Sequence, residues 1–381
     1  MKVSLTDICD FQGGTQPPKD EWIDQPAQGY VRMLQIRDFT QSDKNYIEYV
    51  KDTGKLKTCI EDDILIGRYG ASIGKILTGL AGAYNVAIVK TIPDEKVVSK
   101  KYLYWYLNSQ YFQRFISNVG SRAAQAGFNK NDLGAAQIPL VDKERQEEIC
   151  EVLEKANKLI SLRKQQLAKL DELVKARFVE MFGDPVTNPK GYEKYKLENL
   201  ARKISDGVHS KPDYTETGRP FLSVVNINKG VINFKNCKYV SEDAYQKMIK
   251  STHPERGDVL YTKVGATYGI PAYVDTDIAF CLYVSVCLIK PKREVINPRF
   301  LSLSMEMPYV KHQADRRIKG IGVPDLHLNQ ISEFEILCPP LKEQDIFIYF
   351  VERLDEEKRV VQQSLEKLEL MKKALMQEYF G

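Results

Sequence analysis

The sequence predicts an α+β protein in which two similar β-rich domains are joined by two long helices. We expect the helices to form an antiparallel coiled coil and to give the chain pseudo-two-fold symmetry. Three observations support this prediction: residues 138–183 recur at 336–381, both copies have coiled-coil spacing, and a short loop element recurs in the regions preceding them.

The duplicated stretch extends over 46 residues without a gap. A shift of 198 positions places twelve identical residues opposite each other, among them Gln146/Gln344 and Gly183/Gly381. Chance alone would give roughly three identities, so the chain contains an internal duplication.

Both copies are predicted to be helical, because they are rich in Leu, Glu, Lys, Gln and Ala. Their apolar residues also recur at alternating intervals of four and three residues, as in a coiled coil. The apolar positions are Ile149, Leu153, Ala156, Ile160, Leu167, Leu170 and Val174, then Phe347, Val351, Leu354, Val361, Leu365, Leu368 and Leu375. Arg163, Lys358 and Lys372 interrupt this seam. A helix of about 38 residues is about 57 Å long and needs a partner. The expected partner is the other copy; the alternative is that each helix packs only on its own domain.

Composition shifts predict the domain boundaries. We expect a first domain at 1–140, a first helix at 141–182, a linker at 183–191, a second domain at 192–339 and a second helix at 340–381. Gly183, Pro185 and Pro189 end the first helix. Within the first domain, short apolar runs predict strands at Tyr30–Ile36, Asp63–Ile66 and Ala83–Val89 and a helix at Lys101–Ile116.

The two domains share one loop element. Asp63-Ile-Leu-Ile-Gly-Arg68-Tyr-Gly70-Ala71-Ser72-Ile-Gly74 matches Asp258-Val-Leu-Tyr-Thr-Lys263-Val-Gly265-Ala266-Thr267-Tyr-Gly269. Tyr30–Arg37 aligns with Phe221–Asn228, and Leu5 with Leu197. Outside these anchors the domains diverge, which suggests that one scaffold carries two different binding specificities.

Composition excludes several classes of protein. The net charge of +4 decides little, although it permits local basic patches. The seven cysteines are scattered without a CxxC pair, so we expect reduced, buried thiols and no structural zinc. No apolar run is long enough to span a bilayer and no signal peptide is recognisable, so we expect a soluble, cytoplasmic protein with no membrane partner.

The order of domains and helices resembles the DNA-specificity subunit of type I restriction–modification systems. The resemblance rests on Pro340-Leu341-Lys-Glu-Gln344, its counterparts Pro139 and Gln146, the Met181-Phe-Gly-Asp-Pro185 break, and the repeated D-[IV]-L-x-x-[RK]-x-G-A-[ST]-x-G element. The first copy departs from the family pattern at Val141-Asp142, where Pro-Pro or Pro-Leu is usual.

The resemblance implies a sequence-specific subunit that binds double-stranded DNA and reads a bipartite target, one half-site per domain. It also implies partners: two methyltransferase subunits carrying S-adenosylmethionine, and an ATP-driven restriction–translocase subunit. The chain itself is expected to hold no cofactor. The helices would act as a ruler, and about 57 Å corresponds to roughly 17 base pairs.

The residues indicate no catalysis in this chain. A flipped-base methyltransferase would need a glycine-rich cofactor loop and Asn-Pro-Pro-aromatic, but Asn188-Pro-Lys-Gly and Asn297-Pro-Arg-Phe lack the second Pro. There is no Walker loop, and the four histidines show no metal-ligand spacing. Asp62-Asp63 is interpreted as a turn leading into a strand, not as a catalytic carboxylate pair.

DNA reading requires cations for phosphates and polar side chains for base edges. The expected DNA-contacting residues are Thr15, Gln16, Lys19, Arg68, Ser72, Lys75, Arg122, Gln125 and Lys130 in the first domain, and His209, Ser210, Lys211, Lys263, Thr267, Tyr268, Arg316, Arg317 and Lys319 in the second. The Arg68–Gly74 loop can equally be an ordinary tight turn, and each residue can be an ordinary surface position.

Two rival functions remain at this point. The chain could be a coiled-coil adaptor that binds only protein, or the recognition part of a fused methyltransferase–nuclease. The second would need catalytic segments that this sequence does not contain.

Overall fold

The computed structural model describes residues 1–381 except 42–45, 121–126, 229 and 319–321. Its internal contacts divide the chain into two units. Unit 1 comprises Met1–Gln165 and Gln362–Gly381, and unit 2 comprises Gln166–Val361. Each unit therefore contains the start of one long helix and the end of the other.

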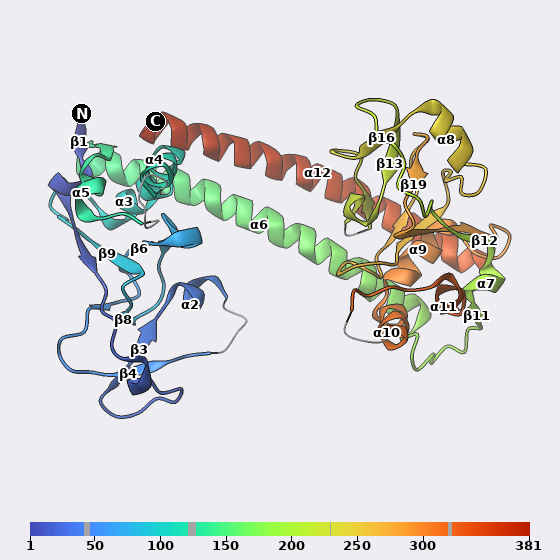
Figure 1. Ribbon diagram of the computed structural model, residues 1–381, viewed down its shortest axis with the longest axis horizontal. Helices are drawn as coiled ribbons and strands as arrows, with labels where there is room; N and C mark the ends of the chain where they lie inside the picture. The colour runs from blue at the N-terminus through green and yellow to red at the C-terminus, as the bar shows by residue number, and fades with distance from the viewer. Residues whose placement is uncertain (42–45, 121–126, 229, 319–321) are drawn as a thin grey trace. The chain divides into compact units, whose positions relative to one another are not determined.

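Unit 1 contains short strands and helices followed by the start of a long helix (Figure 1). In order these are β1 (Lys2–Ser4), α1 (Leu5–Ile8), β2 (Cys9–Gly13), η1 (Lys19–Glu21), β3 (Tyr30–Leu34), α2 (Ile36–Thr40), β4 (Tyr49–Lys51), β5 (Thr58–Cys59), β6 (Leu65–Gly67), η2 (Gly70–Ser72), β7 (Ile76–Leu77), β8 (Gly82–Tyr84), β9 (Ile88–Pro93), α3 (Lys100–Leu107), α4 (Gln110–Gly120), α5 (Lys130–Gly134), β10 (Gln137–Pro139) and α6 (Lys143–Phe182).

Unit 2 has a similar order before the second long helix, with an added β14–β15 hairpin and the added helix α8. Its elements are β11 (Lys194–Lys196), α7 (Leu197–Leu200), β12 (Ala201–Asp206), β13 (Arg219–Leu222), η3 (Val224–Asn226), β14 (Ile227–Asn228), β15 (Val231–Ile232), β16 (Lys238–Val240), α8 (Glu242–Met248), β17 (Val259–Thr262), β18 (Pro271–Tyr273), β19 (Cys281–Leu282), β20 (Val286–Pro291), α9 (Pro298–Glu306), α10 (Pro308–Arg317), α11 (Leu328–Ser332), β21 (Glu335–Leu337) and α12 (Leu341–Phe380).

The two units share one sheet topology. Unit 1 has the sheets β2-β9-β6-β7 and β4-β3-β8-β5, and unit 2 has the matching sheets β12-β20-β17-β18 and β16-β13-β19. The pairs β3–β8 and β13–β19 are parallel, while the other pairs in these four sheets are antiparallel. A shared topology with this unusual parallel pair confirms that the domains are two copies of one scaffold.

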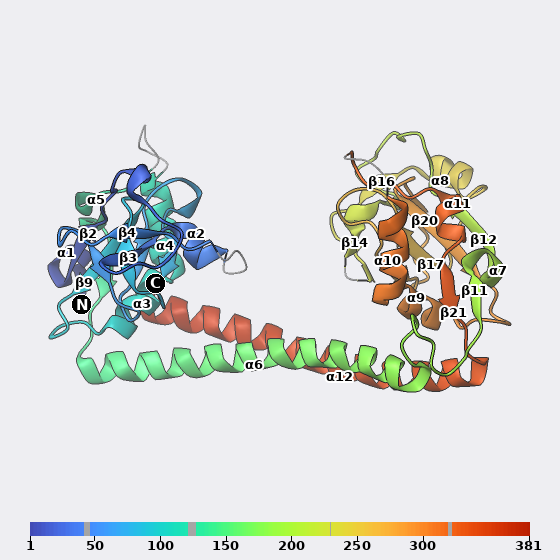
Figure 2. The same ribbon diagram turned by 90° about the horizontal axis from the view of Figure 1, so that it is seen from below.

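Successive side chains along β6 and along β17 point to opposite faces of the sheet, and each face packs against an apolar layer. Ile66 and Tyr261 face the helices α3 and α9, whereas Leu65 and Leu260 face the second sheet. Figure 2 shows α9 and α10 beside β17 and β20 in unit 2. Each domain therefore has a helical layer and two sheets.

The long helices pair antiparallel within each unit. In unit 1, Ile149 and Leu153 near the start of α6 share a core with Met376 and Phe380 at the end of α12. In unit 2 the roles are reversed, and Phe178 near the end of α6 contacts Phe347 near the start of α12, with ring centroids 5.6 Å apart. The antiparallel coiled coil is confirmed, and the alternative of helices packed only on their own domains is wrong.

The lysines that interrupt the seam have partners on the other helix. Lys372 donates to Asn157 Oδ1 at 2.7 Å in unit 1, and Lys358 lies 2.7 Å from Asp171 Oδ1 in unit 2. Both lysines come from α12 and both partners from α6, so these contacts favour pairing of unlike helices.

Three sequence interpretations are wrong in detail. The expected helix at Lys101–Ile116 is two helices, because Ser109 accepts from Phe112 N and starts α4. The expected strand at Ala83–Val89 is broken where Asn85 Oδ1 accepts from Ala87 N at 3.1 Å. Leu34 pairs with Tyr84 of β8, and Leu222 pairs with Leu282 of β19, so Leu34 and Leu222 are equivalent. The alignment of Tyr30 with Phe221 is therefore wrong by three residues.

The long helices start close to the expected residues, and the cysteines are unpaired. The long helices begin at Lys143 and Leu341, where 141 and 340 were expected. The seven cysteines are free thiols, with Cys338 half-buried and the others buried. Across the described part of the chain, no helix combines the length and apolar character needed to cross a membrane.

Candidate nucleic-acid interface

In unit 1, four chain segments meet at one end of the sheet β2-β9-β6-β7. Arg68 N donates to Ala87 O at 2.8 Å, and Gly14 N donates to Ile88 O at 3.1 Å. Arg68 Nε donates to Phe128 O at 2.9 Å, next to a β-bridge between Tyr69 and Gly127. We define the unit 1 rim as Gly13–Gln16, Arg68–Gly74, Asn85–Ala87 and Gly127–Phe128.

The equivalent segments meet in unit 2. Lys263 N donates to Ser285 O at 3.0 Å, and Leu326 N donates to Lys263 O at 2.9 Å. A bridge between Val264 and Asp325 takes the place of the bridge between Tyr69 and Gly127. We define the unit 2 rim as Gly207–Lys211, Lys263–Gly269, Tyr283–Ser285 and Asp325–Leu326.

The shared turn explains the repeated glycines of the loop element. Gly74 and Gly269 have φ values of +75° and +89°, which favour glycine. A Cβ on Gly74 would lie 2.5 Å from Ile116 Cγ2 of α4, and one on Gly269 would lie 2.9 Å from Lys311 Cδ of α10. The tight-turn interpretation is therefore confirmed for these glycines, which set the turn against the following helices.

The cations at the start of this turn differ between the units. Arg68 is half-buried, and its guanidinium lies 5.0 Å from the ring of the exposed Tyr69. Lys263 is only 4% exposed, and its Nζ lies 3.6 Å from carboxylate oxygens of both Asp206 and Asp325. Arg68 therefore remains partly exposed, whereas Lys263 neutralises carboxylates inside unit 2.

The buried surroundings of Lys263 also shift the pKa of Asp206. Burial raises the pKa of Asp206, and the nearby Lys263 and His209 offset only part of that rise. His209 Nε2 lies 3.6 Å from Asp206 Oδ2, with an exposed imidazole. The unit 2 rim is therefore a mixed acidic and basic surface.

Some of the other predicted DNA-contacting residues of unit 1 lie on the rim, and some lie outside it. Thr15 N donates to Tyr84 O at 3.0 Å and Gln16 is exposed, so both belong to the rim. Ser72 lies on the rim turn and Lys75 directly follows it, exposed. Outside the rim, Lys19 pairs with Glu48 and covers Trp22 at 3.8 Å, and Lys130 pairs with Asp10.

In unit 2, His209, Ser210, Lys211 and Thr267 are exposed on the rim. Tyr268 donates to Asp315 Oδ1 at 2.6 Å, and Lys311 lies 3.8 Å from its ring, so this tyrosine is held against α10. Away from the rim, Arg316 and Arg317 line a hollow with Lys196, Glu333 and Glu335 at the end of α10. Arg122, Gln125 and Lys319 lie outside the described residues.

Sequence reasoning missed three residues at or beside these rims. Tyr69 is 38% exposed, and its ring lies beside the Arg68 guanidinium. Val264 occupies its place in unit 2, so the repeat did not highlight it. Asp206 and Asp325 are far from Lys263 in sequence, and only the fold brings them to that cation.

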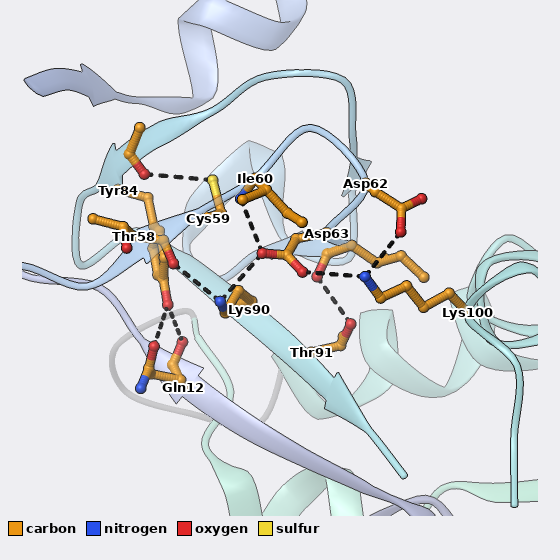
Figure 3. A network of polar contacts seen from close by, with 12 residues as sticks. Gln12, Thr58, Cys59, Ile60, Asp62, Asp63, Tyr84, Lys90, Thr91 and Lys100 are labelled. Atoms are coloured by element: carbon orange, nitrogen blue, oxygen red, sulfur yellow. Dashed lines mark hydrogen bonds and ion pairs between the residues drawn. The ribbon is translucent and has the colours of Figure 1, made fainter. Parts of the chain in front are cut away.

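Asp63 holds the turn that leads into β6 (Figure 3). Its Oδ2 accepts from Ile60 N at 3.0 Å and from Lys90 Nζ at 3.2 Å, and Lys100 lies 3.6 Å from Oδ1. Burial would raise the pKa of Asp63, but the Ile60 N–H and the two lysines outweigh it and lower that pKa. The interpretation of Asp62-Asp63 as a turn leading into a strand is confirmed.

Asp258 makes the same turn bond in unit 2. It accepts from Glu255 N at 2.8 Å and from Lys290 Nζ at 2.8 Å. Here burial dominates over Lys290 and raises the pKa of Asp258. Across the described residues, His, Cys, Asp and Glu side chains form no group able to hold a metal ion.

Comparison with known proteins places this architecture. A family model described as "Type I restriction modification DNA specificity domain" matches residues 1–172 and 189–370. The chain is 23% identical over 397 residues to the type I restriction enzyme MjaVIII specificity subunit of Methanocaldococcus jannaschii, covering 98% of this chain and 90% of the relative. It is 21% identical over 379 residues to the EcoBI specificity subunit of Escherichia coli, covering 93% and 79%.

Solved structures have the same fold. The S subunit of a type I restriction–modification system from M. genitalium matches with a TM-score of 0.56 at 14% identity, covering 100% of this chain and 96% of that one. A chain from a study of complex assembly and conformational transition of the type I R-M system matches with a TM-score of 0.61 at 15% identity, covering 100% and 97%. Because the specificity-domain match occurs twice and spans most of the sequence, the chain belongs to the type I restriction–modification DNA specificity domain family, with two such domains in one polypeptide.

Proposed function

We propose that the chain reads a split DNA target, with the unit 1 rim on one half-site and the unit 2 rim on the other. The observation that carries this proposal is the presence of two specificity domains with one scaffold and different rims. Arg68 beside exposed Tyr69 offers a phosphate contact and a stacking surface. The exposed Ser210, Lys211 and Thr267 of unit 2 offer donors and acceptors for base edges.

The chain acts in this proposal as a non-catalytic subunit. Its partners would be two methyltransferase subunits that bind S-adenosylmethionine, one for each domain, and a restriction–translocase subunit that uses ATP. Relatives that carry the name of type I restriction enzyme specificity subunits support this assignment.

The long helices would set the spacing between half-sites. Each has 40 residues, which corresponds to a length of about 60 Å or roughly 18 base pairs. The Lys372–Asn157 hydrogen bond and the Lys358–Asp171 ion pair, each joining α12 to α6, support pairing of the two helices as the spacer.

Selection from a random-sequence DNA library tests the proposal. The chain is assembled with its methyltransferase subunits, and methylated molecules are recovered and sequenced. We expect two short conserved sequences separated by a spacer of constant length and indifferent sequence. Recovery of a single continuous sequence would contradict the split reading. Recovery of no preferred sequence would favour the adaptor.

A further inference from the structure

A buried glutamine fastens the start of each long helix to its domain. Gln146 and Gln344 are the fourth residues of α6 and α12, and both are 0% exposed. They are identical in the two copies, although most of the residues around them differ. A buried primary amide is costly unless its donors and its acceptor are all bonded, so a matched environment is required in both units.

In unit 1 that environment consists of main-chain atoms. Gln146 Oε1 accepts from Ser99 N at 2.9 Å. Its Nε2 donates to Val97 O and Val141 O, each at 2.9 Å. Ser99 is the N-cap of α3, so one side chain connects the first turn of α6 to the first turn of α3.

Unit 2 repeats these bonds at positions 198 residues further along the chain. Gln344 Oε1 accepts from Asn297 N at 2.8 Å, and Asn297 is the N-cap of α9. Its Nε2 donates to Pro339 O at 2.7 Å and to Val295 O at 3.3 Å. Gln344 Nε2 also lies 3.7 Å from Cys338 Sγ, but the three partners that match those of Gln146 are backbone atoms, so the connection persists while side chains diverge.

A second contact at equivalent positions limits rotation about this connection. Lys101 lies 3.4 Å from Glu154 in unit 1, and Arg299 lies 3.9 Å from Glu352 in unit 2. Each domain is thus held to its long helix by a buried glutamine and an ion pair, in addition to the apolar core that the domain shares with the helix. In unit 2, Asn297 Nδ2 also donates to Asp345 Oδ1 at 2.9 Å.

We propose that Gln146 and Gln344 are positioning residues that fix the orientation of each DNA-reading domain on its long helix. By doing so they restrict the spacing between half-sites that the complex accepts. This inference rests on the proposed function and extends it, because it assigns spacing selectivity to two residues remote from both rims.

The test uses the full chain assembled with its methyltransferase subunits. Methylation is measured on DNA in which the selected half-sites are separated by the preferred spacer or by one base pair more or less. For Gln146→Leu and, separately, Gln344→Leu, we expect the preference for the native spacer to fall by about tenfold, since a misplacement of about 1 Å can cost up to about 100-fold in rate. The base preference within each half-site should stay unchanged.

Gln165→Leu is the matched control, because it makes the same chemical change at an exposed position of α6. It should leave spacer preference as in the wild type. If the Gln146 and Gln344 variants lose activity equally on all spacers, their role is structural only and the inference is wrong. A wild-type complex without any bipartite preference would instead overturn the proposed function together with this inference.

Discussion

The rim turns of the two units share one backbone conformation, but the cation at the start of each turn has different neighbours. Arg68 stands beside an exposed tyrosine, whereas Lys263 is enclosed by two carboxylates. The glycines that the turn requires are retained in both copies. Backbone geometry has therefore been preserved through the duplication, while the side chains on and around the turn have changed.

The aspartates before β6 and β17 extend this comparison. Asp63 and Asp258 both accept from the backbone N–H three residues earlier. Their cations come from different places: Lys90 lies opposite Leu65 in its sheet, while Lys290 follows Ile289, which lies opposite Val259. A required backbone bond has been kept, and its neutralising charge has been supplied independently in each copy.

The largest expected difference between the units is the loss of stability when an apolar side chain is removed where the two long helices meet each domain. Phe178→Ala removes a ring that contacts Phe182, Phe300 and Phe347, with centroids 5.1 to 5.8 Å away. We expect a loss of about 3–5 kcal/mol in the free energy of unfolding of unit 2. Met376→Ala, the equivalent change in unit 1, should cost less, because Met376 is 9% exposed and unbranched. Hydrogen exchange of core amides in each unit measures both, and a larger loss for Met376→Ala would contradict the comparison.

Lys263→Met should destabilise unit 2 without any DNA present. It leaves the carboxylates of Asp206 and Asp325 without their shared cation, at a cost of about 1–3 kcal/mol. Chemical denaturation of the free chain measures this loss. Arg68→Met is the comparison variant and should cost less, about 1 kcal/mol, because it removes the hydrogen bond to Phe128 O but leaves no carboxylate without a cation. Equal losses for both variants would contradict the difference between the two cations.

Arg68→Met should instead weaken DNA binding by the assembled complex. Loss of one phosphate contact lowers the slope of log affinity against log salt by about 1. The effect should be similar on specific and unrelated DNA, since a phosphate contact carries no base information. Binding titrations at several salt concentrations measure the slope, and an unchanged slope would remove Arg68 from the DNA surface.

Asp63→Asn and Asp258→Asn should respond to pH in opposite directions. The pKa of Asp63 is lowered from 3.8 by folding, so its ionised form stabilises unit 1 above that pH and the cost of Asp63→Asn shrinks in acid. The pKa of Asp258 is raised from 3.8, so the wild type gains stability as the pH falls from neutral towards 3.8 and the cost of Asp258→Asn grows. Unfolding curves from pH 7 to pH 3 measure both costs; parallel trends would contradict the assigned pKa directions.

The sequence predicts the elements with long-range regularity and misses those that depend on tertiary contacts. Heptad spacing predicts the two long helices, which are Lys143–Phe182 and Leu341–Phe380 in the structure, because each apolar position along them packs in the same way. The break at Asn85 depends on one side chain bonding a neighbouring backbone, and no periodicity reports it. Burial of Lys263 depends on Asp206 and Asp325, which lie about 60 residues away on either side. A choice of candidate site residues by charge alone therefore includes both exposed cations and cations that are paired with carboxylates inside the protein.

Shortening both helices together tests the central claim most directly. Deleting residues 163–169 and 361–367 removes one heptad from equivalent places in α6 and α12 and keeps the apolar seam in phase. The helices shorten by about 10.5 Å, or roughly three base pairs of DNA. Selection from random DNA should then give both half-sites unchanged with a spacer about three base pairs shorter. An unchanged spacer, or new bases in either half-site, would contradict the account.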